Sequence, residues 1–183
     1  MKRGRKGTPV RRIPTVYTGT SLLFRLNVHQ IAPVLRDITD NVNEYGIVAR
    51  PTPKGPGKFA TNAIDAAGVC VGIYMGRLHL SEARVQDNGR HFDLGSVNGV
   101  RLFVEGAGPS ALNAADFNHS CRRANVAFKF LFEEGLKVVV AITLRRIEPG
   151  EELLVDYGDG YFQPGGTAPC LCEAVCPKNR FFA

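Results

Sequence analysis

The chain has 183 residues, of which 44% are hydrophobic and 22% charged, so it can bury the core of one domain. This composition excludes global disorder, and no apolar run approaches the ~20 residues that span a bilayer. Because residues 1–6 are charged and lack the apolar region of a signal peptide, we expect an intracellular protein with no membrane partner.

The net charge of +6 is concentrated at the N-terminus. Residues 1–12 contain six basic side chains and no acids: Lys2, Arg3, Arg5, Lys6, Arg11 and Arg12. Subtracting these six charges leaves the rest of the chain neutral. We therefore expect residues 1–14 to be a disordered basic tail. Such a tail could contact nucleic acid or serve as a nuclear address, and the alternative is a merely solvated terminus.

Residues 15–45 predict a segment that supports the domain by packing. Residues 21–26 fit a strand, and apolar side chains then recur at the spacing of a short amphipathic helix, at Ile31, Val34, Leu35 and Ile38. Pro33 is tolerable in the first turn of that helix, because the first turn leaves its backbone N–H groups unpaired.

Residues 45–76 predict strands interrupted by a glycine-rich loop. Residues 45–50 fit a strand, residues 51–57 a loop, and another strand begins at Phe59. The β-branched stretch 69–76 predicts one further strand, in which Cys70 is expected to be a small core residue rather than a ligand.

The remaining sequence also indicates β-structure. Residues 81–113 are polar and glycine-rich, and alternating side chains follow them after residue 125. Four strands are expected in this half, at 92–94, 100–103, 126–132 and 138–144, with a hairpin turn at 133–135. Residues 163–167 fit a flexible linker. Many short strands and little helix predict a mostly β domain.

Two short stretches combine reactive groups in a way that ordinary core does not. Residues 118–121 are Asn-His-Ser-Cys, and residues 152–158 are Glu-Leu-Leu-Val-Asp-Tyr-Gly, an apolar strand that ends on an acid, a phenol and a glycine. In this order, and followed by a cysteine cluster, they resemble the signature of the SET-domain lysine methyltransferases. The resemblance runs from about residue 47 to residue 176.

The resemblance implies the SET-domain fold, in which several small β-sheets are combined with a knot-like threading of the C-terminal part. It implies a SET domain over residues 46–162 and a zinc-binding post-SET segment over residues 163–183. It also implies S-adenosylmethionine as the cofactor. The cofactor-binding residues carried over by this resemblance are Lys54, Gly55, Pro56, Gly57, Arg90, Asn118, His119, Tyr157, Tyr161 and Leu171.

These assignments have ordinary structural alternatives. A Gly-Pro-Gly stretch is often only a turn, and Asn118 with His119 could simply cap one. The chain also departs from the family at Ala115, where an arginine is usual, and at Pro56 and Arg90, near which aromatic residues are common. These departures bear on the affinity for the cofactor and on how aromatic the pocket is.

Tyr157 matches the catalytic tyrosine of the family, and Tyr74 matches the tyrosine that lines the lysine channel. Methyl transfer is an in-line displacement that depends on alignment, and the attacking amine must be neutral although a free lysine has a pKa of about 10.4. Burial beside a sulfonium disfavours the ammonium form, so no dedicated base is required. The alternative for both tyrosines is a role as core aromatics.

The five cysteines and the absence of a secretion signal argue against a disulfide framework. Cys170, Cys172 and Cys176 leave a tetrahedral zinc ion one ligand short. In the family the cysteine of the Asn-His-Ser-Cys stretch, here Cys121, is the fourth ligand, and the resemblance therefore implies one structural zinc ion. A free or redox-active cysteine cluster is the alternative.

The sequence thus predicts an S-adenosylmethionine-dependent protein-lysine N-methyltransferase, with histone tails as the leading substrate class and a nuclear or chromatin-associated location. Val155 lies two residues before Tyr157, where the family often has phenylalanine or tyrosine, and its smaller side chain favours di- or trimethylation. The alternative is a catalytically weak or inactive SET-like module, stabilised by zinc, that binds chromatin or nucleic acid.

Overall fold

The computed structural model describes residues 17–18, 28–80, 90–97, 99–108, 110–131, 137–158, 161, 170–172 and 176. These residues form one α-helix, α1 (Val28–Glu44), and a set of short strands, so the prediction of a mostly β protein is confirmed. Several predicted features lie outside the described residues: the tail 1–14, the strand 21–26, the turn 133–135 and the linker 163–167. Within the described part, no helix has both the length and the hydrophobicity needed to cross a bilayer.

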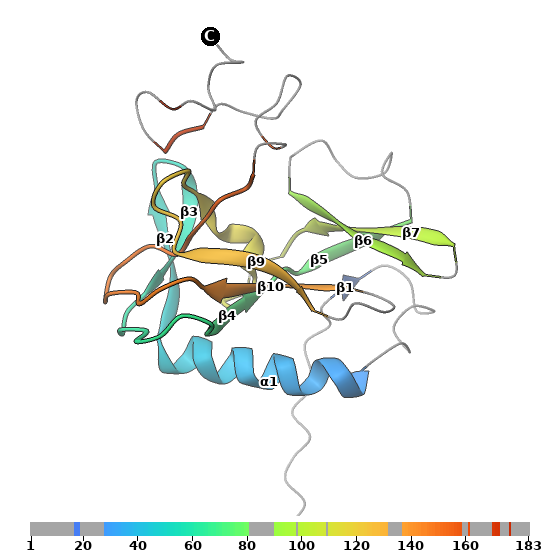
Figure 1. Cartoon of the computed structure of the whole chain (residues 1–183), viewed down its shortest axis with the longest axis horizontal. Coiled ribbons are helices and arrows are strands. Elements are labelled where there is room, and N and C mark those ends of the chain that lie inside the picture. Colours follow the sequence, from blue (N-terminus) through green and yellow to red (C-terminus); the bar gives the residue numbers. More distant parts are fainter. Residues whose placement is uncertain are drawn as a thin grey trace, which may run out of the picture.

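The strands form three small sheets (Figure 1). The four-stranded sheet has the order β1 (Tyr17–Thr18), β5 (Gly76–His79), β7 (Val100–Gly106) and β6 (His91–Val97). The five-stranded sheet has the order β4 (Cys70–Ile73), β10 (Val138–Thr143), β9 (Val126–Leu131), β11 (Leu154–Val155) and β8 (Asn118–His119). The hairpin of β2 (Ile47–Thr52) and β3 (Gly55–Ala60) forms the third sheet, and the short 3-10 helix η3 (Ala114–Asp116) precedes β8.

Helix α1 lies along β4, on the side of the five-stranded sheet seen at the bottom of Figure 1. Its buried side chains include Ile38 and Val42, which join the main core. The helix is longer than predicted, so Pro33 lies in its second turn instead of its first. The Asn62 side chain closes the other end by donating a hydrogen bond of 2.7 Å to the carbonyl of Glu44.

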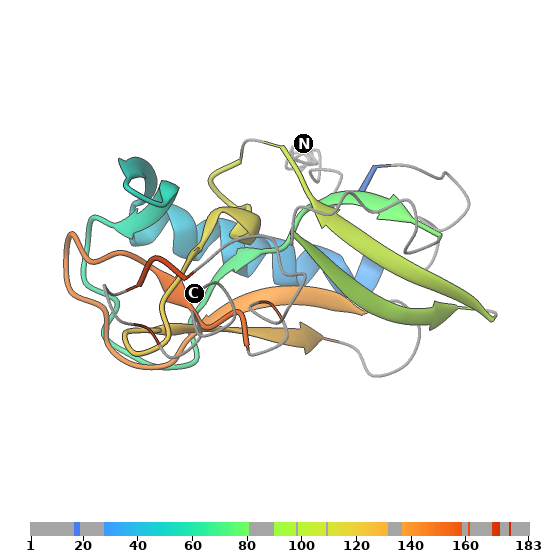
Figure 2. The ribbon, with the colours of Figure 1, turned by 90° about the horizontal axis from the view of Figure 1, so that it is seen from above.

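The single strand predicted over residues 69–76 is wrong, because the chain forms two strands that belong to different sheets. The break falls at Tyr74 and Met75. There the backbone N–H of Met75 donates a hydrogen bond of 3.1 Å to Oδ1 of the buried Asn113 side chain. This bond takes the place of a backbone hydrogen bond to a neighbouring strand. As a result Tyr74 stands at the junction of the two sheets, 4% exposed. Figure 2 shows the β6–β7 hairpin continuing from this junction away from β2 and β3.

The loop predicted over residues 51–57 is also wrong, because most of these residues belong to the hairpin of β2 and β3. Thr52 pairs with Gly55, so only Pro53 and Lys54 form the turn. Gly55 has a positive φ of 102°, which glycine adopts without strain, whereas Gly57 does not lie in the left-handed region.

The C-terminal strand β11 pairs in parallel with both β8 and β9, which precede it in the sequence. Leu154 lies beside Asn118 and Val155 beside His119. This pairing brings the two signature stretches together, so that the residues after β11 begin beside β8.

Candidate active site and metal centre

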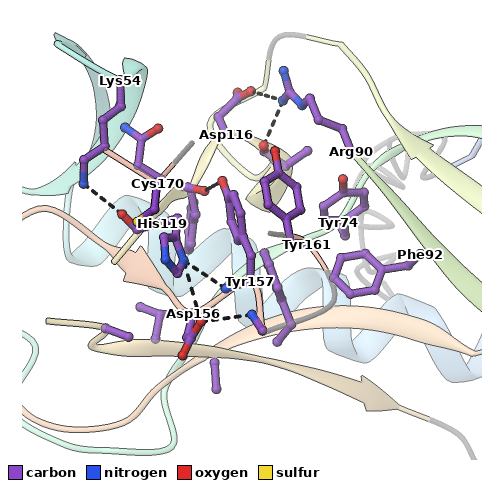
Figure 3. A pocket seen from close by; sticks show the side chains of 18 of the residues that line it. Lys54, Tyr74, Arg90, Phe92, Asp116, His119, Asp156, Tyr157, Tyr161 and Cys170 are labelled. Atoms are coloured by element: carbon purple, nitrogen blue, oxygen red, sulfur yellow. Dashed lines mark hydrogen bonds and ion pairs between the residues drawn. The ribbon is translucent and has the colours of Figure 1, made fainter. Parts of the chain in front are cut away.

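One cavity of about 670 Å³ collects residues from β2–β3, β4–β5, β6, η3–β8, β9 and the C-terminal segments. All residues assigned from sequence to the cofactor and to catalysis line it, except Gly55 and Gly57. Residues that were not assigned also line it, among them His91, Phe92, Asp116, Phe128 and Leu144. Figure 3 shows the side chains that converge on this space.

Tyr157 is held in the cavity by its hydroxyl and by its backbone. The hydroxyl donates a hydrogen bond of 2.6 Å to the carbonyl of Phe117, and the Tyr157 N–H donates to Nδ1 of His119 at 3.1 Å. Burial is the main cause that raises the pKa of this phenol above its usual value, with smaller effects from Tyr161, Arg90 and nearby acids. The hydroxyl therefore remains protonated, and its lone pairs stay available for a further contact.

The cavity has an aromatic wall. The ring of Tyr74 contacts Phe92 edge-on, with 4.8 Å between centroids, and lies 5.8 Å from Phe128. On the other side, Tyr157 lies 4.7 Å from Tyr161. In Figure 3 these rings follow one another from His119 across to Phe92. Because burial also raises the pKa of Tyr74, its phenol is neutral like that of Tyr157. The wall is more aromatic than Pro56 and Arg90 suggested, since Phe92 and Phe128 were not assigned to it.

The polar end of the cavity is formed by Asn118, His119 and Lys54. Asn118 and His119 are both buried, at 9% and 7% exposure. Lys54, from the hairpin turn, donates a hydrogen bond of 2.8 Å from Nζ to the carbonyl of His119. The Asn118 amide donates to Thr52 and Glu152, two residues that sequence reasoning did not assign to the site.

Asp116 holds two cations from different parts of the chain. Arg90 donates to the Asp116 carboxylate at 2.8 Å and to the carbonyl of Ala115 at 2.8 Å. Lys58 is 3% exposed, donates to the carbonyl of Ser110 at 2.8 Å and lies 3.8 Å from Asp116. Burial lowers the pKa of Lys58, and the nearby Asp116 carboxylate partly opposes this effect. A guanidinium thus reaches the backbone of Ala115 although residue 115 is not itself an arginine.

The four cysteines singled out in the sequence lie together. Cys121 Sγ is 3.7 Å from Cys170 Sγ and 3.4 Å from Cys176 Sγ, and Cys170 Sγ is 3.0 Å from Cys172 Sγ. Tetrahedral zinc–thiolate bonds of about 2.3 Å place sulfur atoms ~3.8 Å apart, so this cluster is close to the size that a zinc ion needs. Cys70 lies apart in β4, where its thiol bonds to the carbonyl of Gly72.

The thiols differ in acidity. Burial raises the pKa of Cys121 well above its usual value and that of Cys170 to about 11. Burial would also raise the pKa of Cys172, but hydrogen bonds from the neighbouring thiols outweigh it and lower that pKa to about 7.

His119 lies between the thiol cluster and Tyr157. Its Nε2 is 3.0 Å from Cys121 Sγ, and its Nδ1 accepts the N–H of Tyr157. Potential ligand atoms of His119, Cys121, Cys170 and Cys172 all lie within 4.8 Å of one another, so His119 is a second candidate for the fourth ligand position. The sequence suggested a contact between His119 and the cofactor, but it gave no sign of these two side-chain contacts.

A sequence model of the SET domain matches residues 36–158 of the chain. This match covers most of the chain, and the protein therefore belongs to the SET-domain family, whose members are typically protein-lysine methyltransferases. The match ends at Gly158, the last residue of the second signature stretch, and the cysteines at 170, 172 and 176 lie beyond it.

Proposed function

We propose that this chain is an S-adenosylmethionine-dependent protein-lysine N-methyltransferase. The observation that carries the proposal is the position of Tyr157. Its hydroxyl proton is engaged by the carbonyl of Phe117, while its ring lines the same cavity as Asn118 and Tyr74. One space thus contains a polar end suited to an amino acid and an aromatic end suited to an alkyl amine.

The aromatic end suits the side chain of lysine. Tyr74, Phe92 and Phe128 pack on one another and would form one wall along its methylene groups, and removal of the amine from water disfavours its ammonium form. Because the Tyr157 proton points to the Phe117 carbonyl, the phenol oxygen can accept a hydrogen bond from the neutral amine and orient its lone pair. No carboxylate is needed as a base in this scheme.

The polar end suits the cofactor, whose sulfonium supplies the methyl group. Lys54 would attract its carboxylate, and Asn118 would hold its amino group. Tyr161, Leu171 and the backbone of His119 would enclose the adenosine. Leu171 is 61% exposed, which is consistent with a side chain that becomes covered when a ligand is bound.

We assign a structural zinc ion to Cys121, Cys170, Cys172 and Cys176. The spacing of the thiols supports this set, and both nitrogens of His119 already have partners in Cys121 and the Tyr157 amide. Cys170 and Cys176 are buried, with Tyr157 and Tyr161 packed against them. The ion would therefore fix the chain that closes one side of the cavity.

We propose histone tails as the substrate class and a nuclear location, with the basic residues 1–14 as a contact for nucleic acid. We also propose di- or trimethylation as the product. The reason is the family resemblance, in which the position of Val155, two residues before Tyr157, often has a larger aromatic side chain. Val155 is fully buried in β11 and is not among the cavity-lining residues. The small side chain of Val155 can therefore affect the size of the cavity only through the residues that lie between it and the cavity.

The experiment is to incubate the protein with labelled S-adenosylmethionine and core histones, and then to locate the label by mass spectrometry. We expect methyl groups on lysine ε-amines, and about 100-fold less labelling with the Tyr157→Phe variant. A protein that binds the cofactor but labels no lysine in histones or in a proteome extract would instead be the binding module considered above.

A further inference from the structure

The side-chain amide of Asn118 is fixed by two acceptors behind it. Its Nδ2 donates to Glu152 Oε1 at 2.8 Å and to Thr52 Oγ1 at 3.2 Å. An ionised carboxylate can only accept, so Glu152 can face only the NH₂ side of the amide. Among the described residues no donor reaches Asn118 Oδ1, which is therefore the atom left for a ligand in the cavity.

Thr52 imposes the same orientation. Its hydroxyl donates to the carbonyl of Gly55 at 2.7 Å, so its oxygen must act as an acceptor toward other groups. It accepts the N–H of Lys54 at 3.1 Å and the amide of Asn118, which together saturate the hydroxyl. A flipped Asn118 amide would place an oxygen against two acceptors and leave them without a proton.

Gly57 provides the space for this arrangement. A Cβ at residue 57 would lie 2.3 Å from Glu152 Oε1, 2.8 Å from Asn118 Nδ2 and 3.1 Å from the Thr52 methyl group. Gly57 therefore serves the contacts behind Asn118. It does not line the cavity, and its lack of a side chain is not explained by close approach to a ligand there.

We propose that Glu152, together with Thr52, is a positioning residue that turns the Asn118 carbonyl oxygen toward the amino group of the cofactor's amino acid part. The inference rests on the proposed function. Glu152 itself does not line the cavity, so it acts through Asn118 by a charge-assisted hydrogen bond that polarises the amide. Lys54 supplies the opposite charge at the same end of the cavity, and the two together match an amino acid zwitterion.

The alternative is that Glu152 only joins β3 and β8, and two ligands separate the two roles. S-Adenosylhomocysteine has the amino acid part, whereas 5′-methylthioadenosine has the same adenosine and thioether without it. Hydrogen bonds to a charged group are typically strong enough to change affinity by about tenfold. We therefore expect Glu152→Gln to weaken S-adenosylhomocysteine about tenfold and methylthioadenosine less than twofold, measured by calorimetry.

Glu151→Gln is the matched control, because Glu151 bonds to Arg145 and Asn125 away from the cavity. It should leave the ratio of the two affinities unchanged. If Glu152→Gln does not fold, Thr52→Val tests the same amide and should show the same selective loss.

The possible outcomes separate the role of Glu152 from the proposed function. A wild-type protein that binds neither ligand refutes the proposed function, and this inference with it. A wild-type protein that binds S-adenosylhomocysteine, with variants that weaken both ligands equally or neither, refutes the role of Glu152 and leaves the proposed function standing.

Discussion

Replacement of Tyr157 by phenylalanine removes one hydroxyl and leaves the volume of the ring unchanged. The structural loss is the 2.6 Å hydrogen bond to the carbonyl of Phe117. An unsatisfied buried carbonyl costs about 1–3 kcal/mol, and water in the cavity can partly replace the lost donor, so we expect a loss of about 1 kcal/mol in unfolding free energy. Since a typical domain is stable by about 5–15 kcal/mol, the variant should remain folded.

The loss of activity should be far larger than this loss of stability. Removing one preorganised polar group from an active site typically lowers turnover by about 100-fold or more. We expect that loss in the initial rate of methyl transfer to the best lysine peptide, measured by mass spectrometry, with affinity for S-adenosylhomocysteine changed less than threefold. Tyr45→Phe, a hydroxyl deletion outside the cavity, serves as the control. A Tyr157→Phe variant within threefold of the wild-type rate would refute the catalytic role.

Three further predictions address the metal, the product and the acid stability. Elemental analysis should find one zinc per chain, and Cys172→Ser should release it and reduce activity; metal-free active protein would contradict the site. Val155→Tyr should shift products toward monomethyl-lysine in a mass-spectrometric time course, and a wild type that stops at one methyl would contradict the proposed product. Glu151 has its pKa lowered to about 2, mainly by its hydrogen bonds from Arg145. The stability that this contact gives is present above pH 4.5 and is lost as the pH falls toward 2. Because Arg145 is half exposed and water screens the pair, we expect that loss to be about 1 kcal/mol or less in urea unfolding, and nearly absent in Glu151→Gln.

The sequence predicted the fold class, and the family resemblance assigned Asn118, His119 and Tyr157 from the two signature stretches to one cofactor, because both stretches carry unusual combinations of side chains. It did not predict that one strand ends before Tyr74 and another begins after Met75, since apolar β-branched runs do not reveal which sheet a strand joins. The partners of Asn118 were also hidden. Thr52 and Glu152 are ordinary polar residues, and only the tertiary structure brings them to one amide.

The contacts around Asp116 also could not be predicted from the sequence. The sequence indicated that an arginine was missing at Ala115, and this was correct at that position. Arg90, the residue before β6, nevertheless reaches the Ala115 carbonyl, which only the three-dimensional arrangement reveals. The arginine that contacts residue 115 in this chain therefore lies 25 residues earlier in the sequence.

The contact of His119 with both Cys121 and the Tyr157 amide bears on how the protein is made. The residues gathered here extend from Thr52 to Cys176, and the thiol cluster draws on both Cys121 and the last of them. On the ribosome, a nascent chain can form its N-terminal helix and hairpin early, but it cannot assemble this cluster before Cys176 has emerged. Tyr157, which packs against Cys170 and Cys176, can therefore complete its packing only after Cys176 has been synthesised.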